Sequence, residues 1–557
     1  MSATEEPIEE PMGEKNARQP GSLYKKVGIA SLIMMASVLL SRVIGLLREV
    51  VIAYVGGTGG EVDAYQMAFV LPEILNHVAA TGFLSITFIP IFNKYRVQHE
   101  ETEGWRIFSL ILSSFGSLLL MIILAAWFYA DHLVTLFAPG IEDPAIKALT
   151  IRMTRIVLPA QFFFFIGGLF MAVQFAKEHF LIPALAPLLY NLGIITGGII
   201  LAPWIGIEGF AWGVLGGALA GNFAVQWWGA ARVGMRFKFC FEWTHPDLRH
   251  YVLLTLPLIL GLTMTFSTEF FFRFFGSYMP RGAIAALNYG LRITFILVGL
   301  FGQAVGTASY PFMSRLATEG RMMEMNRLLD QTVRALSIVI PFSVFLMVIR
   351  HETVFILFQR GRFDTAATAL TAQLLPFLLL GAFAFSAQTV VVRGYYALQN
   401  TLFPALVGTA AVLLSIPVFL FCMQQLGTSG VALGVSISAL MQVALLYICW
   451  NRRTDNKESH GVYGTVFKMA LLSIFLGSVL ETVRQSLFSG LSSGSFFGAL
   501  ITCLGLGALF LCLLYPACKI MKMVDIMEIL EKPIQKRIKR FRQKQRSLTQ
   551  RRKNAKE

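Results

Sequence analysis

The chain has 557 residues, of which 55% are hydrophobic and only 14% are charged, with a formal net charge of +15. Soluble proteins carry about 25% charged residues, so this composition argues against a soluble enzyme and favours a polytopic membrane protein. The sequence has no Gly-rich phosphate loop and no His-Glu-x-x-His motif, and nothing suggests a nucleophile–base pair. We therefore expect a membrane protein that is not an enzyme and has no cofactor.

Residues 1–26 are mostly polar, and their acidic residues precede Lys15 and Arg18. This segment lacks the basic start of a cleavable signal peptide. We expect a disordered cytoplasmic tail, with the first spanning helix acting as the insertion signal.

The most informative stretch runs from Ser31 to Tyr95, and it begins with an apolar run long enough to cross a bilayer. This run carries Arg42, Arg48 and Glu49 in its second half. On a helix, these residues share one side with Ser41 and other small or polar residues, and the opposite side is apolar. Ionisable groups at such depth usually face protein or a water-filled cavity. The alternative is that the arginines snorkel to the membrane interface.

Fourteen hydrophobic segments of spanning length follow one another along the chain, and an even number would place both termini on one side. Basic residues gather in alternate connections and in the C-terminal tail, so we expect these to be cytoplasmic. Arg360 and Arg362 are an exception, because their connection should lie outside. The fourteen segments are 27–55, 62–92, 106–129, 147–176, 183–203, 208–232, 248–278, 283–314, 328–349, 366–398, 403–425, 429–450, 463–486 and 494–518.

The sequence also repeats itself at a shift of 221 residues. The segment LFAPGIEDPAIKALT at Leu136 aligns with LFQRGRFDTAATALT at Leu357, and Gly206 and Gly209 align with Gly427 and Gly430. Each repeat holds six predicted spans, which is the arrangement of transporters whose two lobes rock about a central site. The alternative is a duplicated scaffold that transports nothing.

From this repeat we predict an all-α fold of two six-helix lobes, related by a pseudo-two-fold axis along the membrane normal, plus two further helices. The predicted divisions are a disordered tail at 1–26, an N-lobe at 27–240, a C-lobe at 241–458, the two additional helices at 459–520, and a basic cytoplasmic tail at 521–557.

Two more predicted helices carry polar stripes. In the second span, Glu73, Asn76 and His77 share a face, and in the eighth span Asn288, Arg292 and Gln303 do so. Together with the first span they would line a weakly basic cavity that suits an anionic ligand, because arginine forks hold phosphate oxygens well.

Each of these residues has a simpler interpretation. Glu49 could neutralise Arg42, Glu73 could pair with His77, and Arg292 could anchor the interface. Asp63 and Asp143 are placed at helix starts and could act as caps.

At Ser41-Arg42-Val43-Ile44-Gly45-Leu46-Leu47-Arg48-Glu49 the sequence resembles the MurJ (MviN) family of lipid II flippases, in the multidrug/oligosaccharidyl-lipid/polysaccharide exporter superfamily. The resemblance continues at Phe88-Ile89-Pro90, at Arg292, and from Gly394 through Tyr395-Tyr396-Ala397-Leu398 to Pro404. It extends over almost the whole chain.

The resemblance implies a fourteen-helix protein of the bacterial inner membrane, with both termini cytoplasmic. It would flip the undecaprenyl-diphosphate-linked peptidoglycan precursor to the periplasmic leaflet, and its last two helices would form a groove for the lipid tail. The substrate-binding residues that this resemblance and the polar stripes indicate are Ser41, Arg42, Arg48, Glu49, Asn76, His77, Asn288, Arg292 and Gln303.

The chain departs from the family pattern in the second span. A cavity arginine of the family is replaced by Asn76, and a family glutamate by Thr81. The eleventh span, residues 403–421, has no Asn or Asp to bind a hard cation, so we predict no sodium or other metal site there.

These departures keep other functions open: a flippase for another lipid-linked oligosaccharide, a drug or cation exporter of the same superfamily, or a non-transporting envelope scaffold. The expected partners are an anionic lipid-linked substrate, anionic lipid at the basic tail and the peptidoglycan synthesis machinery, but not nucleic acid. The six cysteines indicate neither a disulfide framework nor a metal site.

Overall fold

The computed structural model describes residues 20–79, 81–488 and 495–521, with the side chains at 20–31, 78–86, 254 and 256–266 left out. The predicted tails at 1–26 and 521–557 therefore lie largely outside the described residues. Every regular element in the described part is a helix, which confirms the predicted all-α class.

The N-terminal half of the chain forms a first series of helices. These are α1 (Pro20–Gly56), α2 (Gly60–Met67), α3 (Val70–Ala79), α4 (Thr81–Val97), α5 (Glu101–Phe128), α6 (Ala130–Phe137), α7 (Pro144–Val157), α8 (Ala160–Ala176), α9 (Leu181–Ile205), α10 (Glu208–Gly217), the π-helix η1 (Ala218–Ala224) and α11 (Val225–Arg232).

The remaining helices follow in the second half. They are α12 (Pro246–Gly276), α13 (Ala283–Leu297), the π-helix η2 (Val298–Gln303), α14 (Ala304–Thr318), α15 (Met322–Leu336), α16 (Val339–Val348), α17 (Arg350–Phe358), α18 (Thr365–Leu379), α19 (Ala382–Ala397), α20 (Leu402–Leu426), α21 (Thr428–Arg453), the 3₁₀ turn η3 (Lys457–Ser459), α22 (His460–Val483), the π-helix η4 (Arg484–Phe488) and α23 (Phe496–Ile520).

Each predicted span coincides with one helix or with a run of consecutive helices. Nine stretches in the described part are long and apolar enough to cross a membrane, or ten if α18 and α19, which meet at 44°, count as one broken span. The α1 helix is not among the nine, and its second half carries three ionisable residues. The multi-span architecture is therefore confirmed, whereas the number fourteen stays a prediction.

Helix boundaries in the two halves recur at the offset of 221 residues that the sequence predicts. The helices α9 and α20 end at Ile205 and Leu426, and the glycines that follow them have φ angles of 62° and 56°. Likewise, α8 and α19 end at Ala176 and Ala397, and the non-glycine residues two positions later both have positive φ. Since φ > 0 is uncommon outside glycine, this agreement at matched positions shows that the repeat is structural.

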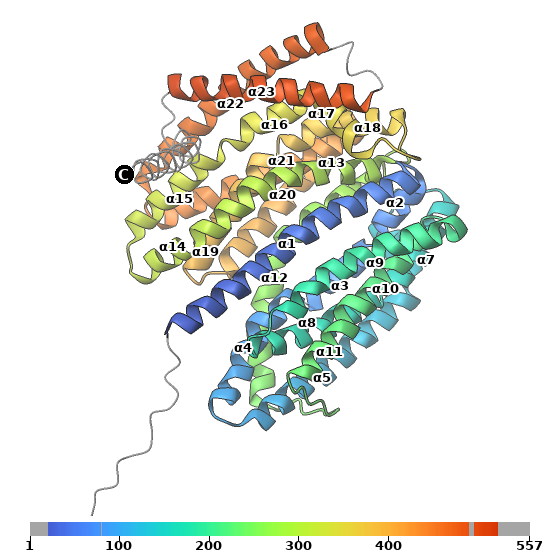
Figure 1. The fold of residues 1–557 in the computed structure, drawn as a ribbon, viewed down its shortest axis with the longest axis vertical. Helices are drawn as coiled ribbons and strands as arrows, with labels where there is room; N and C mark the ends of the chain where they lie inside the picture. Colours follow the sequence, from blue (N-terminus) through green and yellow to red (C-terminus); the bar gives the residue numbers. More distant parts are fainter. Residues whose placement is uncertain (1–19, 80, 489–494, 522–557) are drawn as a thin grey trace, which may run out of the picture.

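Figure 1 shows how these helices are grouped. The helices α3–α5 and α7–α11 lie together on one side, those from α13 to α21 lie on the other, and α1 runs between the two groups. The α12 helix contacts α3 and α4 as well as α20 and α21. The last two helices, α22 and α23, pack on the outer side of α15–α17 (Figure 1).

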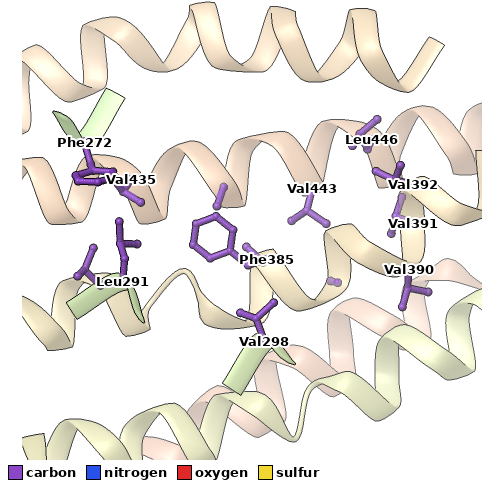
Figure 2. Close-up of a cluster of buried hydrophobic side chains, with 14 of the residues drawn as sticks. Phe272, Leu291, Val298, Phe385, Val390, Val391, Val392, Val435, Val443 and Leu446 are labelled. Atoms are coloured by element: carbon purple, nitrogen blue, oxygen red, sulfur yellow. The ribbon is translucent and has the colours of Figure 1, made fainter. Parts of the chain in front are cut away.

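Apolar side chains fill the second group of helices. Figure 2 shows Phe385 of α19, Val298 of η2 and Val443 of α21 directed toward one another within a large buried cluster. This packing holds α14 and η2 against α19, and α19 against α21, while α13 packs on α18.

The two arginines that depart from the positive-inside pattern have local partners. The Arg360 guanidinium donates to the carbonyls of Ile356 and Leu357 at the end of α17, and the Arg362 amide donates to the carbonyl of Tyr54 at 2.9 Å. Cations at a helix C-terminus are favourable, so capping explains the position of Arg360.

Candidate functional site

The α1 helix presents the two faces that its sequence predicts. Leu39, Leu40 and Leu47 are exposed on the apolar side, whereas Ser37 and Glu49 are buried on the polar side. The polar side therefore faces the protein interior, where it meets α9 and α13 through side chains. Of the two arginines for which snorkelling was the alternative, Arg48 pairs with Glu49 and Asn191 inside the protein, whereas Arg42 is exposed.

Glu49 is the centre of the polar network. One of its carboxylate oxygens lies 2.6 Å from the Arg48 guanidinium and 3.6 Å from Nε of Arg292. The other oxygen accepts a 3.1 Å hydrogen bond from the Asn288 amide. Arg48 also donates to the amide oxygen of Asn191 on α9 at 3.1 Å. The carboxylate of Glu49 is thus contacted by residues of α1 and α13, which belong to the two halves of the chain. Glu49 pairs with Arg48 and Arg292, whereas the alternative interpretation had paired it with Arg42.

The network continues into α12 through residues that the sequence analysis did not identify. Glu269 lies 3.7 Å from the Arg292 guanidinium and 3.2 Å from that of Arg273. Arg273 in turn contacts both carboxylate oxygens of Glu73 on α3, at 2.5 and 3.3 Å. The three arginines and three glutamates therefore form one chain of alternating charge across four helices.

Solvent access differs along this chain of charges. Four side chains are partly exposed: Arg48 (21%), Arg292 (30%), Glu73 (28%) and Glu269 (25%). The other two, Glu49 (3%) and Arg273 (2%), are almost fully buried. The additional arginine and glutamate balance each other. The six residues of the chain of charges are therefore neutral overall, and the exposed Arg42 lies outside this chain.

Arg42 contacts the second half of the chain at Gly299, away from the chain of charges. A Cβ atom added to Gly299 of η2 would lie 2.6 Å from the Arg42 guanidinium, so the two residues are in close contact. Ser41 beside it is partly buried.

The remaining predicted residues divide into two groups. His77 and Asn76 lie partly buried on α3, and Nδ1 of His77 is 2.7 Å from the backbone carbonyl of Glu73. Gln303 contacts Arg393 of α19 at 3.4 Å, and no contact with the chain of charges is found for it among the described residues. The π-helix η2, which ends at Gln303, changes the helical register after Arg292, so the placement of Gln303 on the same stripe as Arg292 stays a prediction.

A second set of contacts joins the two halves near the start of α13. Asp63 of α2 accepts hydrogen bonds from the amides of Gly282 and Ala285, at 2.5 and 2.8 Å, and so caps a helix of the other half. Asp143 caps its own helix α7 through the amide of Ala145, as predicted, and also pairs with Arg281 at 2.5 Å. A Cβ on Gly57 would come within 2.5 Å of the Arg362 carbonyl, so only glycine fits this approach.

Arg273 and Glu269 could have been found in the sequence. They are the charged residues of the otherwise apolar run TEFFFRFFG, four positions apart, and a spacing of four places both on one face of α12. What the sequence could not supply is their partner, because Glu73 lies 200 positions away.

This arrangement can bind an anion. Arg292 has no hydrogen bond among the described residues, and both of its ion pairs are longer than 3.5 Å, so its donors remain available to a ligand. Forked guanidinium donors from two halves of a protein are suited to a group with several oxygens, such as a diphosphate.

Comparisons with known proteins agree with this description. The family model described as "Lipid II flippase MurJ" matches residues 52–502. A "Probable lipid II flippase MurJ" of Thermotoga maritima is 26% identical over 496 residues, covering 88% of this chain and 96% of the relative. The "Lipid II flippase MurJ" of Burkholderia cenocepacia is 25% identical and covers 76% of this chain and 83% of the relative.

Solved structures show the same fold. A structure titled "Lipid II flippase MurJ, inward closed conformation" has a TM-score of 0.73 at 22% identity, covering 88% of this chain and 99% of that one. An inward-facing multidrug resistance MATE family transporter of the MOP superfamily has a TM-score of 0.59 at 15% identity, covering 76% and 98%.

Proposed function

The chain belongs to the lipid II flippase MurJ family, and from this membership we propose that it transfers lipid II from the cytoplasmic to the periplasmic leaflet of the bacterial inner membrane. It does so as a multi-pass transporter and not as an enzyme. The observation that carries this proposal is the shared contact of Glu49 with Arg48 and Arg292, which places cationic donors from both halves of the chain at one point.

The diphosphate of the substrate binds at Arg48 and Arg292. Arg292 is held loosely and is the first to receive it, whereas Arg48 exchanges its 2.6 Å contact with Glu49 for phosphate oxygens. A multiply charged headgroup competes well with a single carboxylate for these donors, because charge-assisted bidentate contacts are among the strongest polar interactions in proteins. Ser41, Arg42, Asn288 and the α3 residues Asn76 and His77 line the approach.

Transport follows from alternating access between the two halves. The contacts of Asp63 with α13 and of Asp143 with Arg281 close the side that the positive-inside pattern predicts to be periplasmic. An anion that bridges Arg48 and Arg292 draws the two halves together on the other side, and the periplasmic contacts then separate. The ligand thus changes the relative stability of two arrangements of the same helices.

The lipid tail stays in the membrane beside α22 and α23. Both helices expose large apolar side chains, including Phe467, Phe475, Phe497 and Leu504, each about two-thirds exposed or more. The basic segment from Lys519 to the end carries fourteen Lys and Arg residues in the sequence, and we place it at the anionic cytoplasmic surface together with the N-terminus. From there it is available to the peptidoglycan synthesis machinery.

The proposal is tested by replacing the chromosomal gene with Arg48→Ala or Arg292→Ala in its bacterium, under depletion of the wild-type protein. We expect lipid-linked precursor to accumulate in the inner leaflet and cells to lyse, and mass spectrometry identifies which lipid accumulates. The matched control is Arg152→Ala. It removes an exposed arginine of α7, whose guanidinium lies 2.6 Å from the carboxylate of Glu208 on α10. Normal growth and an unchanged leaflet distribution with stably expressed Arg48→Ala and Arg292→Ala proteins would contradict the proposal.

A further inference from the structure

We propose that Arg273 is a positioning residue that determines the charge selectivity of the site. It keeps the carboxylates of Glu73 and Glu269 in ion pairs, so that they do not repel a diphosphate bound at Arg48 and Arg292. This inference rests on the proposed function and adds a residue that neither the sequence motifs nor the family resemblance identifies.

The geometry places Arg273 beneath the two carboxylates. Its guanidinium contacts Glu73 through two donors and Glu269 through one, and its side chain is 2% exposed. The two glutamates keep about a quarter of their surface accessible. A ligand approaching from the open side therefore meets the carboxylates and not Arg273 itself, so Arg273 acts through Glu73 and Glu269.

The carboxylate of Glu269 lies next to the proposed anion site at Arg292, where its negative charge would repel a bound anion. Its carboxylate lies 3.7 Å from the Arg292 guanidinium, so a phosphate held by Arg292 comes within a few ångströms of Glu269. Two negative charges at that separation in a partly buried site oppose each other strongly. The ion pair with Arg273 is what offsets this repulsion.

Removal of Arg273 would reverse the balance of the chain of charges. Three carboxylates, those of Glu49, Glu73 and Glu269, would then face two guanidinium groups, those of Arg48 and Arg292. Because Arg273 has no other acidic partner among the described residues, its charge is available entirely to Glu73 and Glu269. A site of this composition would favour a cation over an anion.

The test measures binding of two lipids to the purified full-length protein in nanodiscs. Undecaprenyl diphosphate carries the anionic group, and undecaprenol has the same chain without it. We expect Arg273→Gln to weaken binding of the diphosphate about tenfold or more while binding of undecaprenol changes less than about twofold. Arg273→Gln combined with Glu269→Gln should restore the diphosphate affinity to within about threefold of wild type. Arg152→Gln serves as the control for loss of a positive charge.

If Arg273 had a purely structural role, Arg273→Gln would weaken binding of both lipids equally. That result would overturn the inference, and so would an unchanged affinity for the diphosphate. Glu269→Gln alone provides a measurement that does not depend on folding of the Arg273 variant. It should tighten diphosphate binding and leave undecaprenol binding unchanged, and an unchanged or weaker diphosphate affinity would overturn the inference as well. If the wild-type protein did not prefer the diphosphate over the alcohol, the proposed function itself would fail, so the two failures are distinguishable.

Discussion

Two aspartates illustrate how the same residue type acts locally in one case and between the two halves in the other. Asp143 precedes α7 and accepts from an amide two positions later, which is the usual geometry of an N-cap. Asp63 lies within the first turn of α2, yet it accepts from Gly282 and Ala285, more than 200 positions away. The carboxylate therefore stabilises the positive end of the α13 dipole only while the two halves are in contact.

We expect Asp63→Ala to loosen the start of α13 by about 1–2 kcal/mol, which corresponds to roughly five- to thirtyfold faster exchange of the Gly282 and Ala285 amides. Hydrogen–deuterium exchange with mass spectrometry measures this on the purified protein. Asp143→Ala is the comparison, because it removes a cap of α7 and should leave peptides from Gly282 to Ala285 less affected than Asp63→Ala does. Equal exchange in the wild-type and Asp63→Ala proteins would show that the cap does not hold α13.

At this scale the sequence predicted the identity of several site residues better than their partners. Arg48, Glu49, Asn288 and Arg292 were predicted to share one wet surface, because polar residues at helical spacing in apolar runs usually face inward. In the structure, the other three residues all lie near the carboxylate of Glu49. No contact of Gln303 with these four residues is found in the described part of the chain, and the sequence contains no sign of the π-helix that changes the helical register before it.

Among the helices, α9 and α10 show how glycine permits close packing in a membrane. A Cβ atom on Gly213 of α10 would lie 2.7 Å from the Gly193 carbonyl and 2.9 Å from the Cα of Ile194. Gly216, on the same helix, has nothing within 4 Å of its Cβ position. Small residues at such crossings let the backbones approach, and this gain in contact replaces the hydrophobic drive that lipid does not provide.

We therefore expect Gly213→Val to lower the free energy of unfolding by about 1–3 kcal/mol, since backbone atoms cannot move aside as a flexible side chain can. Gly216→Val should change it by less than about 0.5 kcal/mol. Thermal unfolding of both variants in the same detergent measures the difference. Equal melting temperatures for the two variants would show that the α9–α10 contact has room for a side chain.

The positions of the helices were predicted well from the sequence, whereas the breaks between consecutive helices were not. The predicted span 62–92 is divided into α2, α3 and α4, and the short helices α6 and α17 were not predicted. Apolar composition indicates where a chain can enter a membrane but contains no information on bends that depend on neighbouring helices. The shift of 221 residues was more informative, because it relates turns in the two halves that have different residues, such as Glu178 and Gln399.

For the whole molecule, the contacts near the start of α13 close one side of the interface between the two halves. They comprise the Asp63 cap, the pair of Asp143 with Arg281, and the backbone contact of Arg362 with Tyr54. Under the alternating-access mechanism that we propose, all of them separate in each cycle.

We expect that linking Asp143→Cys to Arg281→Cys with a short, reducible bis-thiosulfonate reagent abolishes lipid II flipping and that reduction restores it. The measurement uses the full chain in proteoliposomes, with the six native cysteines replaced. The matched control links Arg152→Cys to Glu208→Cys, because that ion pair of 2.6 Å lies within one half. Undiminished flipping by the linked Asp143–Arg281 protein would mean that this interface need not open.

The constant offset between the halves also relates Arg48 to Glu269. These two residues occupy equivalent positions on α1 and α12: Arg48 pairs with Glu49, which lies 3.6 Å from Arg292, and Glu269 lies 3.7 Å from Arg292. A symmetric ancestor with the same residue in both copies would have carried like charges at this point. This chain instead has opposite charges at the two equivalent positions, so the site is asymmetric in charge although the helices around it are repeated.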